Sequence, residues 1–198
     1  MTVGAESERK TWYLPKKVLT HCSPFFDAAL NGNFAEASAK AVDLPEDDPK
    51  AFEVWATWLS LGKCRLPFDN GGFDLTPVRA WNLGEKFACP AFKDHVMSQL
   101  LDWFDADENL SLGAIEAVYV ISPPGSKVRR FFVDWFVWYK RNANLDADEV
   151  IVFLREVPEF SDDVVRREVN WGSIMKKHQH YGQYYENPGF KPDAWDLE

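Results

Sequence analysis

The sequence predicts an α+β fold, in which a small mixed sheet is surrounded by helices and followed by an all-helical extension. Two observations favour this class. Stretches with strand character occur near the start of the chain, at 12–14 and 39–44, and the second stops at Pro45. Between residues 76 and 169, successive segments carry apolar residues at helical spacing.

Composition limits the classes of function. The 198-residue chain is 46% hydrophobic and holds nine tryptophans, which suits a core of one domain or one and a half. The formal net charge of −9 argues against nonspecific binding to nucleic acid and against adhesion to an anionic membrane. No apolar run approaches the roughly 20 residues of a membrane span, and residues 1–11 are too polar for a signal peptide.

Cysteine usage indicates a reducing compartment. Cys22, Cys64 and Cys89 are odd in number and well separated, so neither a disulfide framework nor a zinc finger is indicated. We therefore expect a cytoplasmic or nuclear protein.

The first elements follow from local signals. Residues 4–10 are the expected turn between a residual first strand and the strand at 12–14, and residues 15–22 are expected to form a short helix. Ser23 and Pro24 supply the cap and first turn of a second helix. A Gly/Asn-rich turn then leads into the strand at 39–44.

The most hydrophobic predicted element is the helix at 49–61. Phe52, Trp55, Ala56 and Leu59 recur at helical spacing, and apolar residues also fill the adjoining face. A helix that is apolar almost all round is expected to be central. Its tryptophans should find polar partners for their indole N–H groups, and Gly62 is the expected C-terminal stop.

Five blocks of residues occur in an order that resembles the BTB/POZ domain, particularly the short fungal BTB proteins. These blocks are Trp12, Leu14, Lys16, Val18 and Leu19; Ser23, Pro24, Phe25 and Phe26; Phe34 and Glu36; Leu44, Pro45, Glu46 and Asp47; and Trp58, Leu59 and Gly62. A further match is Trp81, Leu83, Gly84, Lys86, Phe87, Pro90, Ala91, Phe92, Lys93 and Asp94. The resemblance implies a BTB/POZ fold and a function in protein–protein interaction.

Two functions within that family stay open. The first is a non-enzymatic scaffold or assembly domain. The alternative is a substrate adaptor of a cullin-based ubiquitin ligase, because Phe34-Ala35-Glu36 has the form and place of the motif that meets the cullin in such adaptors. Phe34 would fill a pocket and Glu36 would meet a basic rim. The structural alternative is that Phe34 covers the sheet and Glu36 caps a turn.

The resemblance also implies a surface for self-association on the first helix, with Lys17, Val18 and Cys22 as its candidate residues. Relatives exchange their first strand between copies, and only Thr2 and Val3 remain of it here. A stable homodimer needs more buried surface than the helix alone offers. We therefore expect a monomer or weak homodimer whose free surface binds another protein.

The middle of the chain is expected to hold an edge strand at 63–68 and a loop at 69–74. The loop sequence DNGGFD lacks the acidic spacing of an EF-hand calcium site. Thr76 is expected to cap the next helix, and Gly84 inside that helix indicates close packing against a neighbour. Pro90 begins a further helix.

The charged stretch 105–109 is the predicted boundary. It divides the chain into a BTB/POZ domain at 1–105, a BACK-like helical extension at 106–170 and a polar aromatic tail at 171–198, which is expected to be mobile. Docking of the tail tyrosines onto the body or a partner is the alternative. His178 and His180 lie two apart without further ligands nearby, so no metal is expected.

Capping residues define the helices of the extension. Ser126, Asp146 and Ser161 precede apolar periodic segments and are expected to be N-caps. The second helix is amphipathic, and its polar residues, including Arg129 and Asp134, are expected to face solvent.

No arrangement of residues indicates catalysis. His21, Cys22 and Ser23 are adjacent, and adjacent residues of a helix do not face one another. Nucleophile-elbow, dinucleotide-binding and Walker patterns do not occur. We expect neither enzymatic activity nor a cofactor.

Overall fold

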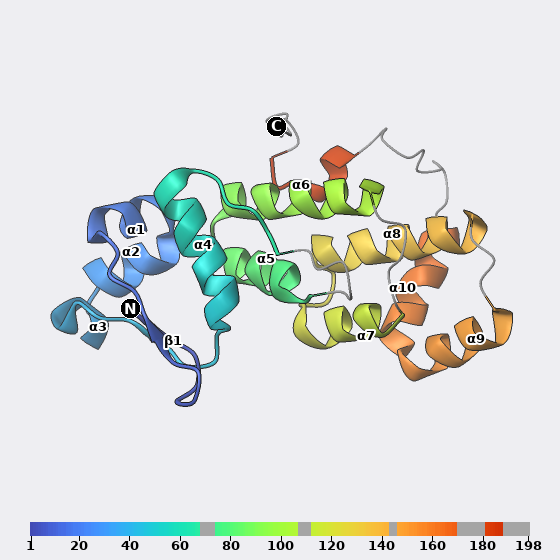
Figure 1. The fold of residues 1–198 in the computed structure, drawn as a ribbon, viewed down its shortest axis with the longest axis horizontal. Helices are drawn as coiled ribbons and strands as arrows, with labels where there is room; N and C mark the ends of the chain where they lie inside the picture. Colours follow the sequence, from blue (N-terminus) through green and yellow to red (C-terminus); the bar gives the residue numbers. More distant parts are fainter. Residues whose placement is uncertain (68–73, 107–111, 143–145, 170–180, 188–198) are drawn as a thin grey trace.

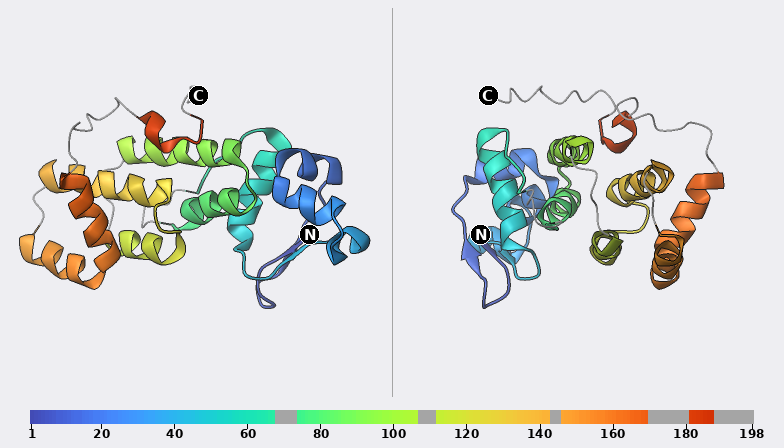
Figure 2. Two further views of the ribbon diagram at one scale, coloured as in Figure 1. Left: turned by 180° about the vertical axis from the view of Figure 1, so that it is seen from behind. Right: turned by 45° about the vertical axis from the view of Figure 1, so that its right-hand side comes forward.

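The computed structural model describes residues 1–67, 74–106, 112–142, 146–169 and 181–187, and its class is α+β, as predicted (Figure 1). The elements are β1 (Thr2–Val3), β2 (Lys10–Thr11), α1 (Lys16–Cys22), α2 (Pro24–Asn31), α3 (Ala35–Ala39), β3 (Asp43–Leu44), α4 (Pro49–Leu61), α5 (Thr76–Lys86), α6 (Pro90–Ala106), α7 (Leu112–Ile121), α8 (Lys127–Asn142), α9 (Ala147–Glu156), α10 (Pro158–Val169) and the 3-10 turn η1 (Tyr181–Tyr184). The sheet and α1–α4 lie at one end of an elongated molecule, and α9 and α10 lie at the other (Figures 1 and 2).

The sheet is small and mixed. Its order is β2-β1-β3, with β1 antiparallel to β2 and parallel to β3. The second strand is Lys10–Thr11 rather than the predicted 12–14. Trp12 leaves the ladder after its N–H donates to the carbonyl of Met1 (2.8 Å), and its ring packs on Phe52 at 4.8 Å between centroids.

The short helix predicted at 15–22 is present as α1, and the cap and first-turn signals of α2 are confirmed. The Ser23 hydroxyl accepts from the N–H of Phe26, and Pro24 is the first helical residue. The same hydroxyl donates to the carbonyl of Phe87 at 2.6 Å, so this cap also ties α2 to the end of α5.

Helix α4 is central, as its pattern predicts. Asp48 caps it through the N–H of Ala51 (2.8 Å), and Gly62 ends it at φ 72°. The Trp55 ring lies 4.9–5.2 Å from the rings of Phe26 and Phe87. Among the described residues the Trp55 indole N–H reaches no nitrogen or oxygen acceptor, and the polar group that interacts with it is the buried thiol of Cys89.

Helices α5 and α6 pack closely where Gly84 lies. A Cβ at this position would come within 2.6 Å of Lys93 Cγ and 3.1 Å of the Phe92 ring, so the predicted close approach is confirmed. The cap predicted at Thr76 is wrong, because the N-cap position is Leu75, which has no side chain able to cap the helix. Asp74 accepts the N–H of Thr76 at 2.8 Å, and Thr76 already belongs to the helix.

The predicted edge strand at 63–68 is wrong over its described residues, 63–67. This segment is irregular, and side chains of α6 replace a neighbouring strand as its partners. Cys64 N–H donates to His95 Nε2 (3.2 Å), and Leu66 N–H donates to Gln99 Oε1 (2.9 Å). Gln99 also donates to the carbonyl of Cys64 at 2.9 Å.

Two of the three caps in the helical extension are confirmed. The Ser126 hydroxyl accepts from the N–H of Arg129, and Asp146 accepts from the first turn of α9. The third is wrong, because α10 begins at Pro158 and Ser161 lies inside it. Pro158 has the fixed backbone angle that suits a first helical position, so the helix starts one turn early.

The solvent-facing position predicted for Arg129 and Asp134 is wrong: they are 5% and 0% exposed. Arg129 donates to Glu159 Oε2 (2.7 Å) and lies over the Tyr119 ring (4.4 Å). Asp134 accepts from Arg167 of α10 and from the hydroxyl of Tyr184. Helix α10 and the segment 181–187 cover this face of α8, which the helical pattern alone does not reveal.

The prediction that the tail is mobile is also wrong for its described part. Tyr184 and Tyr185 are 1% and 5% exposed, and η1 lies against α6 and α8 (Figure 1). Docking on the body is therefore the outcome for 181–187. The stretches 68–73 and 107–111, His178 and His180 lie outside the described residues, so the calcium, boundary and histidine predictions stay untested there.

Candidate interaction site

The predicted contact residues Phe34 and Glu36 lie at the start of α3. The turn expected there is a short helix, in which Phe34 is the N-cap and Glu36 belongs to the first turn. The Phe34 ring is 60% exposed, so it does not cover the sheet. Glu36 is half-buried. The arrangement presents an aromatic ring and a carboxylate from one helical turn.

Gly32 permits this presentation of Phe34. A Cβ at Gly32 would lie 2.4 Å from the carbonyl oxygen of Ala28 and 3.1 Å from the Phe34 ring. A larger residue would therefore push against both the end of α2 and the ring. The glycine that the sequence places before Phe34 thus helps to set the direction of the aromatic side chain.

An apolar groove of about 370 Å³ lies in the same part of the molecule. It is lined by Met1, Trp12, Tyr13, Leu14, Pro15, Lys16, Leu19, Leu30, Ala37, Lys40 and Val42. Phe34 falls between Leu30 and Ala37 in the chain, and Tyr13, at 94% exposure, is a second exposed ring. Sequence reasoning missed the groove, because segments distant in the chain form its walls.

Two lysines give the groove its charge. Lys16 Nζ donates to the carbonyl of Leu30 at 2.7 Å, which holds the beginning of α1 against the end of α2. Lys40 is exposed and has a left-handed backbone at the end of α3. The groove therefore combines apolar walls with positive charge, while Glu36 supplies a carboxylate on α3.

The predicted self-association residues lie on α1. Lys17 is exposed, whereas Val18 and Cys22 are half-buried. Leu19 is buried in the core, as expected. The apolar surface that α1 leaves open is therefore limited to part of Val18 and Cys22.

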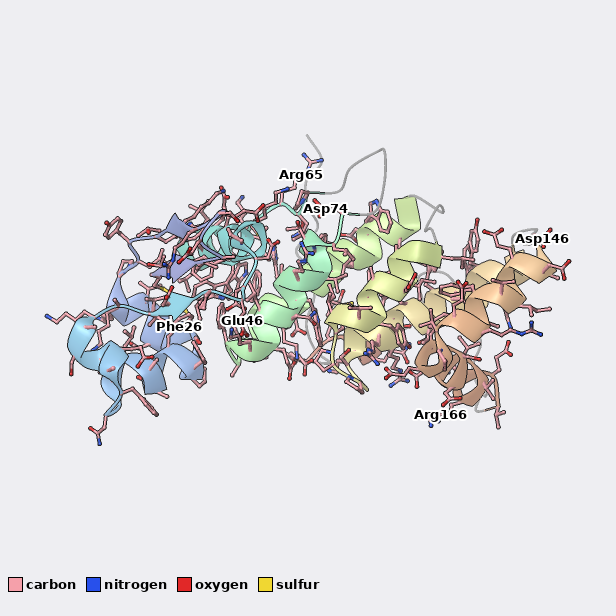
Figure 3. All side chains as sticks on the ribbon, turned by 90° about the horizontal axis from the view of Figure 1, so that it is seen from below. Phe26, Glu46, Arg65, Asp74, Asp146 and Arg166 are labelled. Carbon is pink, nitrogen blue, oxygen red and sulfur yellow. The ribbon has the colours of Figure 1, made fainter. Side chains whose placement is uncertain are left out.

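Other kinds of site find little support in the described residues. No group of three or more histidine, cysteine or acidic side chains in this part of the chain is placed to hold a metal ion. The described helices are all too short or too polar to cross a membrane. Seen from below, Phe26 lies among the N-terminal helices, far from Asp146 and Arg166 at the opposite end (Figure 3).

Comparison with known proteins adds no relative. The chain matches no family model, no curated protein and no solved structure. The function is therefore argued from the residues and their arrangement.

Proposed function

We propose that the chain is a non-enzymatic protein–protein interaction module of the BTB/POZ type, with a BACK-like helical extension, that serves as a scaffold or assembly domain. The observation that carries the proposal is the exposed ring of Phe34 at the start of α3. Exposed aromatic residues beside apolar surface are typical anchors of protein interfaces. We expect the module to act in the cytoplasm or nucleus.

The arrangement of the N-terminal half supports this proposal. A small mixed sheet with helices around it is what the resemblance to BTB/POZ domains implies. The matched blocks also have consistent structural roles. Ser23 caps α2, Asp48 follows the fourth block and caps α4, and Gly62 ends α4.

Assembly is tested by light scattering behind a sizing column, from micromolar to millimolar chain. A weak homodimer through α1 gives a mass that rises with concentration, and Val18→Arg should abolish the rise because it introduces like charges across a two-fold axis. Glu46→Lys, at an exposed position away from α1, is the control. A concentration-independent dimer would contradict the expected weak association.

Phe34 and Glu36 also favour the second candidate function, a substrate adaptor of a cullin-based ubiquitin ligase. Titration of a purified cullin tests it. Phe34→Ala should weaken binding by roughly 30-fold, the effect of losing an aromatic anchor worth about 2 kcal/mol. Glu36→Lys should also weaken binding, whereas Glu46→Lys should not.

The two tests separate the candidates. Failure of the wild-type chain to bind the cullin removes the adaptor function and leaves assembly. A constant monomer at millimolar concentration, together with no cullin binding, overturns both.

A further inference from the structure

The segment 181–187 lies on a face built by α6 and α8, and its contacts resemble those of a bound peptide. Two aromatic side chains are buried, one acidic side chain is paired, and the main chain is held by side chains of the body. These three kinds of contact are the usual means by which folded domains recognise short segments.

Tyr184 is the central anchor. Its ring packs edge-on against Phe131 of α8, with 5.7 Å between centroids. Its hydroxyl donates to Asp134 Oδ2 at 2.6 Å. Burial, followed by the neighbouring Asp134 carboxylate, raises the pKa of Tyr184 well above its ordinary value, so the hydroxyl stays a donor. The pocket thus recognises both the ring and the hydroxyl of a tyrosine.

Glu186 provides the charged contact. Its carboxylate lies 2.8 Å from Lys93 Nζ of α6 and 3.3 Å from Lys127 Nζ at the start of α8. Although burial opposes ionisation, the two ammonium groups lower the pKa of Glu186 below its ordinary value. The site therefore selects an acidic residue two positions after the tyrosine anchor.

The main chain of the segment is also recognised. The Asp94 carboxylate accepts the N–H groups of both Glu186 and Asn187, the second at 3.0 Å. Lys127 Nζ donates to the carbonyl of Tyr185. Asp94 is almost fully buried under the segment, so its carboxylate depends on an occupant for these hydrogen bonds.

We propose that the α6–α8 face is a peptide-binding site, that residues 181–187 are its internal ligand, and that a partner protein carrying a tyrosine–tyrosine–acidic segment binds there by displacing them. The occupant is defined by the contacts of Tyr184, Tyr185 and Glu186. Because the internal segment is tethered, its effective concentration is in the millimolar range, and it competes strongly with a free peptide.

The test uses a fluorescein-labelled peptide of residues 181–187, YGQYYEN, and the full-length chain. In Tyr184→Ala the internal ligand loses its anchor, so the labelled peptide should bind at least ten times more tightly than to the wild-type chain. Tyr13→Ala, which removes an exposed tyrosine at the other end of the molecule, is the control and should bind like wild type.

Specificity is tested by a double-mutant cycle in the Tyr184→Ala chain. Lys127→Ala should weaken the wild-type peptide by a larger factor than a peptide in which Glu186 is replaced by Ala, because the ion pair is lost only from the first, whereas the hydrogen bond to the carbonyl of Tyr185 is lost from both. A peptide without the tyrosine equivalent to Tyr184 should bind at least ten times more weakly than YGQYYEN. These results would place the peptide on the same contacts as the internal segment.

If Tyr184→Ala does not fold, two further measurements test whether the α6–α8 face binds the peptide. Glu186→Lys keeps both tyrosines but repels Lys93 and Lys127, and it should also increase peptide binding. In the wild-type chain, millimolar unlabelled peptide should increase the hydrogen-exchange rates of the Glu186 and Asn187 amides several-fold.

Three results would overturn the proposal. Folded variants that bind the peptide no better than wild type would show that the face accepts no ligand. Amide exchange unaffected by peptide would show that the segment is not displaced. A wild-type dimer that becomes monomeric in Tyr184→Ala would assign the docked segment to a second copy.

Discussion

The core around α4 and the region around α6, α8 and α10 are stabilised in different ways. Around α4, aromatic rings pack on one another, and Ser23 is the one buried polar residue among the described residues before Thr76. Beyond that point, buried polar and charged side chains are frequent: Thr76, Lys93, Asp94, His95, Ser98, Gln99, Ser122, Arg129 and Asp134.

The difference teaches which interactions define each region. Apolar contacts are non-directional, so the first core depends on shape and volume. Buried charges require particular partners, and loss of one partner leaves the other desolvated. The first region should therefore respond to changes in side-chain volume, and the second to changes in hydrogen bonding and protonation.

The largest effect is expected from Trp55→Ala. Removal of a buried tryptophan should lower the free energy of unfolding by about 3–5 kcal/mol. Urea unfolding measures it, with Trp58→Ala as the control on the same helix. Trp58 is only half-buried, so its replacement should cost less. Equal costs would show that α4 is not the centre of its core.

Arg167→Met should lower the free energy of unfolding by about 3 kcal/mol, because Asp134 loses its cationic partner in a buried site. The neighbouring Arg166 provides a matched control. It is largely exposed and pairs with Asp163 at 3.5 Å, so Arg166→Met should change stability by less than about 1 kcal/mol. Similar effects of the two substitutions would contradict the importance of the buried pair.

Tyr184→Phe should cost about 1 kcal/mol, because it keeps the ring but removes the hydrogen bond to Asp134. Thermal unfolding of Tyr184→Phe and Tyr13→Phe compares a buried hydroxyl with an exposed one. No loss in Tyr184→Phe would mean that Asp134 does not depend on the Tyr184 hydroxyl as a donor.

The smallest expected effect is the change of folding stability with pH. Burial lowers the pKa of His95 below 6.5, against the hydrogen bond to Cys64, which raises it. The unfolded chain therefore binds a proton more readily than the folded one, and stability is lost as pH falls below about 6.5. Between pH 7.5 and 6.0 this loss should reach at most about 0.8 kcal/mol. His95→Gln should remove it, and an unchanged pH dependence would assign the loss to other groups.

Much of the N-terminal half could be predicted from the sequence. The cap at Ser23, the stop at Gly62 and the burial of Trp55 follow from short-range rules, because each signal lies within one or two helical turns of its effect. The exposed Phe34 was also proposed from the sequence, although its short helix was not.

Only the tertiary structure decided the remaining features. The burial of Asp134 depends on Arg167 and Tyr184, which lie 33 and 50 residues away in the chain. The groove lined by Met1, Leu19 and Val42 and the docking of residues 181–187 likewise combine distant segments. Helical periodicity identifies which residues share a face, but which element covers that face is determined by packing between segments far apart in sequence.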